Sequence, residues 1–233
     1  MNLGITKDET RKSGEQPAFY INGPEGRLEA VLSIPQSGKK KIIAVVCHPH
    51  PLYDGSLNNK VTYTIARTLS QQGVTALRFN FRGVGDSEGE YSEGVGEAED
   101  LKAVIAYVRK TYPGHALWLA GFSFGAYVSL KVSTQTVVDR LITVAPPVNF
   151  FDFRSLTTPS CPWLVIQGND DEIVPFDEVQ LWLDDLLRAP DVIVLSNVGH
   201  FFHRQLNALR ESIESFIMPV FSAHHNALPQ AAG

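Results

Sequence analysis

Short apolar runs alternate with amphipathic segments along most of this chain. Near-continuous apolar runs occupy residues 42–47, 74–81, 116–122, 141–145, 163–168 and 191–197. Runs of this length predict strands that are buried on both faces, as in a parallel sheet covered by helices. Two further runs, at 18–23 and 27–34, are separated by the turn sequence Pro24-Glu25-Gly26, and they predict a hairpin at the start of the fold.

Between these runs, apolar residues recur every three or four positions, which predicts helices with one apolar face. The residues concerned are Val61, Ile65 and Leu69; Leu101, Val104, Ile105 and Val108; Val179, Trp182, Leu183, Leu186 and Leu187; and Leu206, Leu209, Ile213, Phe216 and Ile217. The alternation predicts an α/β fold, with a mostly parallel sheet of about eight strands and helices on both faces. In such sheets the chemistry lies at the carboxyl ends of the strands.

The composition is typical of one soluble globular domain. The chain has 233 residues, of which 44% are hydrophobic and 19% charged. We expect a single domain over residues 18–220, between flexible tails at 1–17 and 221–233. The net charge of −5 and the lack of a dense basic stripe argue against a nucleic-acid partner or an anionic membrane surface.

Compartment and assembly are also suggested by the sequence. No apolar run reaches the roughly 18 residues of a membrane-spanning helix, and residues 1–16 lack the apolar core of a signal peptide. Cys47 and Cys161 form no C-x-x-C pair and are typical of thiols in a reducing compartment. We therefore expect a cytoplasmic protein without a cofactor, either a monomer or a small homo-oligomer.

Two segments, GDSEG (85–89) and GFSFG (121–125), match G-x-S-x-G, the pattern of a serine nucleophile on a sharp strand-to-helix turn. A strong apolar run leads into Ser123, and small residues and a helical pattern follow it, as this turn requires. Around Ser87, glycines and acids follow the strand, and neighbouring carboxylates would oppose the negative charge of an oxyanion. The sequence therefore favours Ser123 as the nucleophile.

A serine nucleophile needs a base that is oriented by an acid, and in this kind of fold the order along the chain is serine, acid, histidine. The strand predicted at 163–168 ends just before Asp170 and Asp171, and only one of these neighbours can orient the base. The strand predicted at 191–197 is followed by His200, again at a carboxyl end. His203, by contrast, is expected on the surface of the next helix.

An oxyanion formed at the nucleophile needs two N–H donors. One is expected from Phe124, the residue after the nucleophile, and the other from the loop after the third strand. That loop reads CHPHPLYDGS, in which Pro49 and Pro51 have no N–H. The backbone N–H of His50 is therefore the favoured second donor.

Together these segments resemble the α/β-hydrolase superfamily. The resemblance rests on GFSFG, on NDDEIVP (169–175), on VGHFF (198–202) and on RGVGDSEG (82–89). The stretch HPHPLYDGSLNNKV (48–61) is similar to small bacterial members related to dienelactone hydrolases, often described as esterases with little or no cap. The resemblance covers residues 18–217, and it implies an α/β-hydrolase fold without a large cap domain.

Carried over by position, the resemblance implies that Ser123 is the nucleophile and His200 the base. The family spacing of Asp, two residues and Val-Pro selects Asp171 over Asp170 as the acid. Dienelactone hydrolases proper use a cysteine where this chain has Ser123, which puts that particular activity in doubt. The expected reaction is cleavage of a small-molecule carboxylic ester through an acyl-enzyme; a thioesterase, an amidase or an acyltransferase would use the same residues.

The connection between residues 146 and 162 is too short for a cap domain and contains three phenylalanines. The candidates for lining a substrate pocket are Leu52, Tyr53, Phe150, Phe151 and Phe153. The three phenylalanines fit equally well with anchoring the connection to the core.

Two alternatives of another class stay open at this point. A metallohydrolase would use His48 and His50 as ligands, although no other group of His, Asp or Glu has matching spacing. A binding protein could have the same fold without catalysis, because a fold does not determine a function. Such a protein would not need Ser123, Asp171 and His200 together.

Overall fold

One sheet organises the protein, and the middle strands of the chain lie at its centre. In the computed structural model, which describes residues 14–225, eight strands have the order β1-β2-β4-β3-β5-β6-β7-β8. They are β1 Phe19–Gly23, β2 Gly26–Ser33, β3 Ile42–Cys47, β4 Thr75–Phe79, β5 Ala116–Phe122, β6 Arg140–Val144, β7 Trp163–Gly168 and β8 Asp191–Leu195. The pairings β1 with β2 and β2 with β4 are antiparallel, and the others are parallel.

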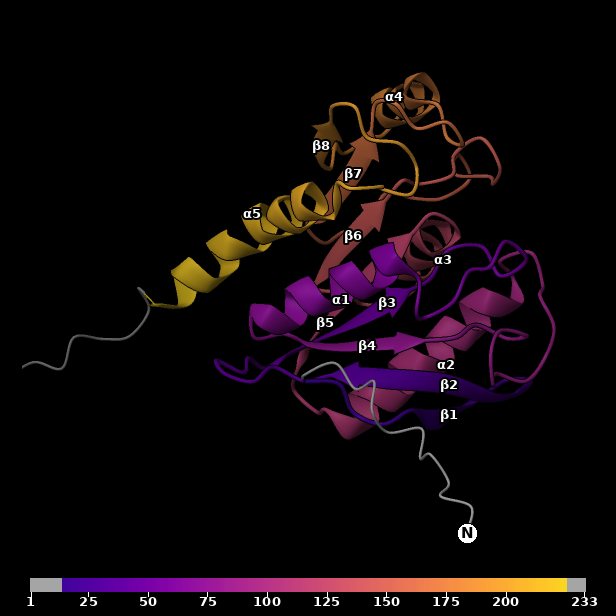
Figure 1. The fold of residues 1–233 in the computed structure, drawn as a ribbon, viewed down its shortest axis with the longest axis vertical. Helices are drawn as coiled ribbons and strands as arrows, with labels where there is room; N and C mark the ends of the chain where they lie inside the picture. The colour runs from indigo at the N-terminus through magenta and orange to yellow at the C-terminus, as the bar shows by residue number, and fades with distance from the viewer. Residues whose placement is uncertain (1–13, 226–233) are drawn as a thin grey trace, which may run out of the picture.

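In the described part of the chain, five helices cover the two faces of this sheet (Figure 1). They are α1 Lys60–Gln71, α2 Gly96–Thr111, α3 Phe124–Ser133, α4 Phe176–Asp184 and α5 Leu206–His225. Apolar residues of α1 and α5 pack on one face, and those of α2, α3 and α4 pack on the other. The predicted architecture is therefore confirmed. None of these helices combines the length and the apolar character that crossing a membrane requires.

The strand boundaries lie within two residues of the predicted runs, and the larger differences fall at the ends of two helices. Helix α4 ends at Asp184, so Leu186 and Leu187 lie beyond it, and the side chain of Leu187 is fully exposed. Helix α5 continues to His225, past the expected domain end at residue 220. The expected tail residues 1–13 and 226–233 lie outside the described residues.

The connection from β6 to β7 determines how open the carboxyl edge of the sheet is. It spans residues 145–162 and contains neither a helix nor a strand. A cap domain needs secondary structure of its own to bury a core. The fold therefore has no cap inserted at this position, as the length of the connection predicts.

Arg78 is a charged residue in the otherwise apolar strand β4. Its guanidinium is fully buried, donates a hydrogen bond of 2.6 Å to the carbonyl of Leu57, and is paired with the carboxylate of Glu15. Burial lowers the pKa of Arg78, while the charge of Glu15 raises it. Buried charges require such partners, so residue 15, which was expected in the N-terminal tail, is part of the packed structure.

A second buried ion pair anchors the glycine-rich loop between β4 and α2. Arg82 donates from its backbone N–H and Nε to one carboxylate oxygen of Asp100, both at 3.0 Å, and from Nη2 to the other oxygen at 2.8 Å. Both side chains are buried, and Glu25 lies 2.5 Å from Nη1 of the same guanidinium. This two-pronged pairing ties the start of the loop to helix α2.

We expect Asp100→Asn to destabilise the protein by about 3 kcal/mol or more, because it leaves the Arg82 cation buried with an incomplete set of partners. Urea unfolding at pH 7.5 would measure this loss. Glu99→Gln is the matched control, because Glu99 pairs with Lys102 on the exposed face of the same helix and such pairs contribute little. Equal stabilities of the two variants would contradict the expectation.

Candidate active site

Ser123 lies on a sharp turn between β5 and α3. Strand β5 ends at Phe122 and α3 begins at Phe124, so one residue makes the whole connection. The backbone of Ser123 has φ 53° and ψ −119°, a conformation that is costly for any residue with a side chain. Its N–H donates to the carbonyl of Val144 in β6 at 2.8 Å, which holds the turn in place. The predicted strand-to-helix turn is therefore present at Ser123.

The glycines on either side of Ser123 allow this turn to pack closely. A Cβ on Gly121 would lie 2.1 Å from the carbonyl oxygen of Gly125. A Cβ on Gly125 would lie 2.4 Å from the carbonyl oxygen of Cys47 and 2.6 Å from that of His48. Because these neighbours are backbone atoms, they cannot move aside as a flexible side chain could. The spacing G-x-S-x-G is thus a steric requirement of the turn.

The structure joins Ser123, His200 and Asp171 by consecutive hydrogen bonds. His200 Nε2 is 3.0 Å from Ser123 Oγ, and His200 Nδ1 is 2.9 Å from Asp171 Oδ2. A carboxylate accepts, so Nδ1 carries the proton, and the lone pair of Nε2 faces the serine hydroxyl. All three side chains are buried. Residues far apart in sequence, at the ends of β5, β7 and β8, meet at one edge of the sheet.

The two neighbouring acids after β7 have different surroundings. Asp171 is buried, and its Oδ1 accepts the N–H groups of Ile173 and Val174 at 2.9 and 2.7 Å. Asp170 is exposed, and it contacts this region through its backbone N–H, which donates to the carbonyl of Val198. Only Asp171 therefore faces His200, which is the choice that the family spacing implies.

Two residues that the sequence analysis did not single out support this arrangement. Gln167 Nε2 donates to Asp171 Oδ2 at 3.0 Å, and Glu172 Oε2 accepts the backbone N–H of His200 at 3.0 Å. Gln167 is the one side chain in the strand sequence WLVIQG that combines a donor and an acceptor, which is a usable signal for a polar role. Glu172 carries no comparable signal, because acids are common on exposed loops.

The N–H groups expected to bind an oxyanion take no part in the backbone hydrogen bonding of the fold. Phe124 is the first residue of α3, so its N–H has no partner within the helix. Among the described residues, neither this N–H nor that of His50 has a backbone partner. The imidazole of His50 lies 5.2 Å from the ring of Phe124, measured between centroids. Both residues line one hollow together with Ser123, and the role of their N–H groups as oxyanion donors stays a prediction.

The ring of His50 is held by two further hydrogen bonds. The N–H of Leu52 donates to Nδ1 at 3.2 Å, and Nε2 is 3.0 Å from the hydroxyl of Tyr91. Because Nδ1 accepts, the proton of the neutral ring lies on Nε2 and is donated to Tyr91. Burial lowers the pKa of His50, which favours this neutral form. The loop after β3 is thereby fixed to the glycine-rich loop that carries Tyr91.

A cleft of about 470 Å³ opens directly at Ser123, and we call it the aromatic cleft. Its lining residues are His50, Tyr53, Tyr91, Glu93, Ser123, Phe124, Pro147, Phe150, Phe151, Asp152 and Ile173. Three of the predicted pocket residues, Tyr53, Phe150 and Phe151, are among them. The prediction is wrong for two others: Leu52 points into solvent, and Phe153 is buried against Tyr127 and Trp182.

Comparisons with known proteins agree with this geometry. A protein from Coxiella burnetii, described as an alpha-beta serine hydrolase homologue, is 47% identical, with a TM-score of 0.83 over 84% of this chain and 95% of that one. A Xanthomonas campestris structure, described as an a/b serine hydrolase without lid, is 39% identical, with a TM-score of 0.84 over 95% of this chain and 99% of the other. This chain belongs to the α/β serine hydrolases.

Two further comparisons gave matches to this chain. An uncharacterised protein of Rickettsia prowazekii is 34% identical to this hydrolase over 220 residues, which cover 90% of this chain and 92% of the relative. A family described as serine aminopeptidase, S33 matches residues 58–158. That segment includes Ser123 but ends before Asp171 and His200.

The other G-x-S-x-G segment of the hydrolase has a structural role. Ser87 is buried; its hydroxyl donates to the carbonyl of Asn80 at 2.8 Å and accepts the N–H of Glu29 at 2.9 Å. These bonds join the glycine-rich loop to β2 and to the end of β4. With its hydroxyl committed to two backbone groups and no histidine among its hydrogen-bond partners in the described chain, Ser87 lacks the base that a nucleophile needs.

His48 also has a structural role, which removes it as a metal ligand. Its Nδ1 donates to the carbonyl of Pro49 at 2.6 Å, and its Nε2 accepts the N–H of Phe81 at 3.0 Å. A histidine binds metal through a nitrogen lone pair, and the only lone pair of the neutral ring is used here. The arrangement therefore does not fit a metal site built on His48 and His50. His203 lies in the loop before α5 and not on a helix as expected.

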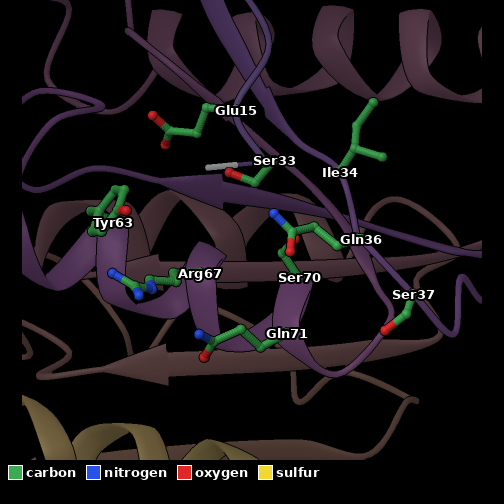
Figure 2. Close-up of a pocket in the computed structure, with 10 residues that line it drawn as sticks. Glu15, Ser33, Ile34, Gln36, Ser37, Tyr63, Arg67, Ser70 and Gln71 are labelled. Atoms are coloured by element: carbon green, nitrogen blue, oxygen red, sulfur yellow. The ribbon is translucent and has the colours of Figure 1, made fainter. Parts of the chain in front are cut away.

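A separate hollow of about 270 Å³ lies between α1 and the chain after β2 (Figure 2). Glu15 and Ser33 line it from one side, and Arg67 and Gln71 of α1 line it from the other. Ser33 pairs with the beginning of β4, so the hollow lies at the amino ends of the parallel strands. It is therefore at the opposite end of the sheet from Ser123.

We expect acid to weaken the fold through His48. Burial lowers the pKa of His48 from 6.5 to about 4, so the unfolded chain binds a proton that the folded protein excludes. The stability present above pH 6.5 is therefore lost as the pH falls toward 4, by roughly 3 kcal/mol. In His48→Gln this contribution is absent, so the stability advantage of the wild type over the variant should shrink over that range.

Urea unfolding at several pH values between 7.5 and 4 measures this difference. His203→Gln serves as the control, because His203 is exposed and its replacement should leave the pH dependence unchanged. A difference between wild type and His48→Gln that stays constant over the whole range would contradict the expectation.

Proposed function

We propose that this hydrolase is a carboxylesterase that forms an acyl-enzyme on Ser123. The observation that carries the proposal is the pair of hydrogen bonds from His200, at 3.0 Å to Ser123 Oγ and at 2.9 Å to Asp171 Oδ2. A serine hydroxyl is a weak nucleophile at neutral pH, and an imidazole at this distance can take its proton. The buried carboxylate stabilises the imidazolium that forms and keeps the proton on Nδ1.

The proposed reaction has two stages. In the first, Ser123 Oγ attacks the ester carbonyl while His200 Nε2 takes the serine proton, and His200 then gives that proton to the departing alcohol. In the second, a water attacks the acyl-enzyme, with His200 as the base, and releases the acid. Each stage passes through a tetrahedral oxyanion, for which the N–H groups of Phe124 and His50, neither of which has a backbone partner in the described chain, are the proposed donors.

The openness of the site supports a small-molecule ester as substrate. No cap covers the carboxyl edge of the sheet between β6 and β7, and the aromatic cleft reaches Ser123 from the surface. Such a cleft suits a compact or surface-accessible ester better than a long acyl chain held in a closed tunnel. Amide cleavage is a second candidate, because the family that matches residues 58–158 is described as a serine aminopeptidase. Turnover of p-nitroanilides compared with p-nitrophenyl esters separates the two.

We expect a fluorophosphonate to label Ser123 and to abolish the hydrolysis of p-nitrophenyl esters. Ser123→Ala and His200→Ala should each lower kcat by several orders of magnitude, because they remove the nucleophile or its base. Mass spectrometry of the labelled peptide identifies the modified serine. Ser87→Ala is the matched control, because Ser87 lies in the other G-x-S-x-G segment, and this variant should still be labelled at Ser123. An adduct on Ser87, or full activity of Ser123→Ala, would overturn the proposal.

We expect Asp171→Asn to lower kcat about 10⁴-fold, and Asp170→Asn to leave it within about twofold. In the Asp171→Asn variant the side-chain oxygen can keep accepting the two backbone N–H groups, which places the amide nitrogen, a donor, opposite His200 Nδ1. The imidazole proton then moves to Nε2, where it faces Ser123. Asp170 is exposed, and the hydrogen bonds of His200 and Gln167 go to Asp171 instead. Steady-state kinetics of the two variants on one p-nitrophenyl ester test the assignment, which fails if Asp170→Asn is the impaired variant.

A further inference from the structure

Gln167 is an uncharged polar residue near the end of the otherwise apolar strand β7, and its side chain is fully buried. Its amide nitrogen faces three acceptors: Asp171 Oδ2 at 3.0 Å, the carbonyl oxygen of Val174 at 3.2 Å and that of Gly168 at 3.3 Å. Because all three groups accept, the nitrogen and not the oxygen of the amide must face them. The nearest acceptor is the carboxylate of Asp171.

The other half of the same amide has no partner. Gln167 Oε1 is buried, and it accepts no hydrogen bond from any residue that the structure describes. A buried acceptor without a partner costs free energy, whereas an apolar side chain of similar length would fill the space without that cost. Stability alone is therefore a poor reason for an amide at this position, and its donor must be considered for a role in the chemistry.

The donor of Gln167 completes the set of hydrogen bonds to Asp171. Oδ1 accepts the backbone N–H groups of Ile173 and Val174, and Oδ2 accepts His200 Nδ1 and Gln167 Nε2. Ile173 and Val174 lie in the same loop as Asp171, so their N–H groups move with it. Among the described donors to this carboxylate, Gln167 is the one that lies in a strand of the sheet.

Gln167 thus ties the loop that carries Asp171 to a rigid part of the fold. Strand β7 pairs with β6 on one side and with β8 on the other, and the same amide also bonds the backbone of Val174 further along the loop. We propose that Gln167 is a positioning residue, which holds Asp171 Oδ2 in front of His200 Nδ1. This inference rests on the proposed function, in which His200 is the base.

The consequence for the reaction follows from how Oδ2 is shared. The amide proton of Gln167 takes one lone pair of Oδ2, which leaves the other for the proton on His200 Nδ1. The direction of that bond sets the plane of the imidazole, and so it aims Nε2 at Ser123 Oγ, 3.0 Å away. A small misalignment of a base toward its nucleophile lowers the rate steeply.

Two buried side chains in neighbouring strands provide matched variants. Gln167→Met keeps the length of the side chain and removes both the donor and the unpartnered oxygen. Thr143→Val is the control: the hydroxyl of Thr143 in β6 is buried, accepts Trp163 Nε1 at 2.9 Å and donates to the carbonyl of Leu164 at 3.3 Å. Both variants lose buried hydrogen bonds, but those of Thr143 go to residues outside the proposed reaction.

We expect Gln167→Met to lower kcat on a p-nitrophenyl ester by roughly 10- to 100-fold and to leave KM within twofold. The rate at which a fluorophosphonate labels Ser123 should fall by a similar factor. Thr143→Val should keep both rates within twofold. In urea unfolding, Gln167→Met should lose no more stability than Thr143→Val. A wild-type kcat in Gln167→Met, or a larger loss of stability than in the control, would assign Gln167 to the fold alone.

Two further measurements test whether Gln167 acts through Asp171. In the Asp171→Asn background, Gln167→Met should lower kcat no further, because the bond that it removes no longer positions a carboxylate. The low-field proton resonance of His200 Nδ1–H, identified by its loss in His200→Ala, should shift in Gln167→Met and stay in place in Thr143→Val. A further tenfold loss in the double variant, or an unshifted resonance in Gln167→Met, would contradict the inference.

Failure of the proposed function gives a different result. In that case the wild type itself neither hydrolyses esters nor takes up a fluorophosphonate on Ser123, and the inference falls with the function on which it rests. If the wild type does both and Gln167→Met matches it, the function stands and only the role of Gln167 is refuted.

Discussion

The first turn of α3 lies against the end of β3 with no space for a side chain between them. Gly125 faces the carbonyl groups of Cys47 and His48 at distances that exclude a Cβ. This contact holds Ser123 in its costly backbone conformation, and it places the N–H of Phe124 beside the loop that carries His50. The proposed nucleophile, Ser123, and the loop that carries His50 are therefore brought together by one backbone-to-backbone contact. Strain at a site persists only where the surrounding structure over-determines it.

Three histidines near this contact carry out different tasks because their hydrogen bonds differ. His48 is fully buried, and both of its ring nitrogens are bonded to backbone groups, so it joins the loop after β3 to the loop after β4. His50 accepts a backbone N–H on Nδ1 and so presents its proton to Tyr91. His200 gives its Nδ1 proton to Asp171, which leaves Nε2 as an acceptor toward Ser123. In each ring the partner of one nitrogen determines what the other can do.

The glycine-rich loop between β4 and α2 shows how one short pattern can serve two purposes. Its serine, Ser87, bonds to backbone groups of neighbouring strands, whereas Ser123 in the same pattern faces a histidine. The loop is anchored by the buried pair of Arg82 and Asp100, and Glu97 accepts the N–H of Gly94 at 2.7 Å. A loop so firmly held can place Tyr91 against His50, and in this way it becomes part of the cleft wall.

Local patterns along the chain were enough to predict the sheet, its helices and the edge at which the reacting residues meet. Apolar runs and helical periodicity report burial, and the carboxyl ends of parallel strands must lie along one edge. Ser123 and His200 could therefore be assigned to that edge from the amino-acid sequence alone. The residues by themselves could not separate Asp170 from Asp171, because adjacent side chains differ only in the direction that the folded loop gives them.

The same limit applies to Leu52 and Phe153, which were expected in the pocket and lie in solvent and in the core. Gln167, Glu172 and Tyr91 were missed for a related reason. Glu172 meets His200 and Tyr91 meets His50 across long stretches of sequence, and such pairings are set by the packing of strands and loops in three dimensions. Gln167 meets Asp171 only four residues away, but through a loop whose path a sequence pattern does not give. Periodicity describes which side of an element is buried, whereas the partner that a polar side chain meets there depends on the whole fold.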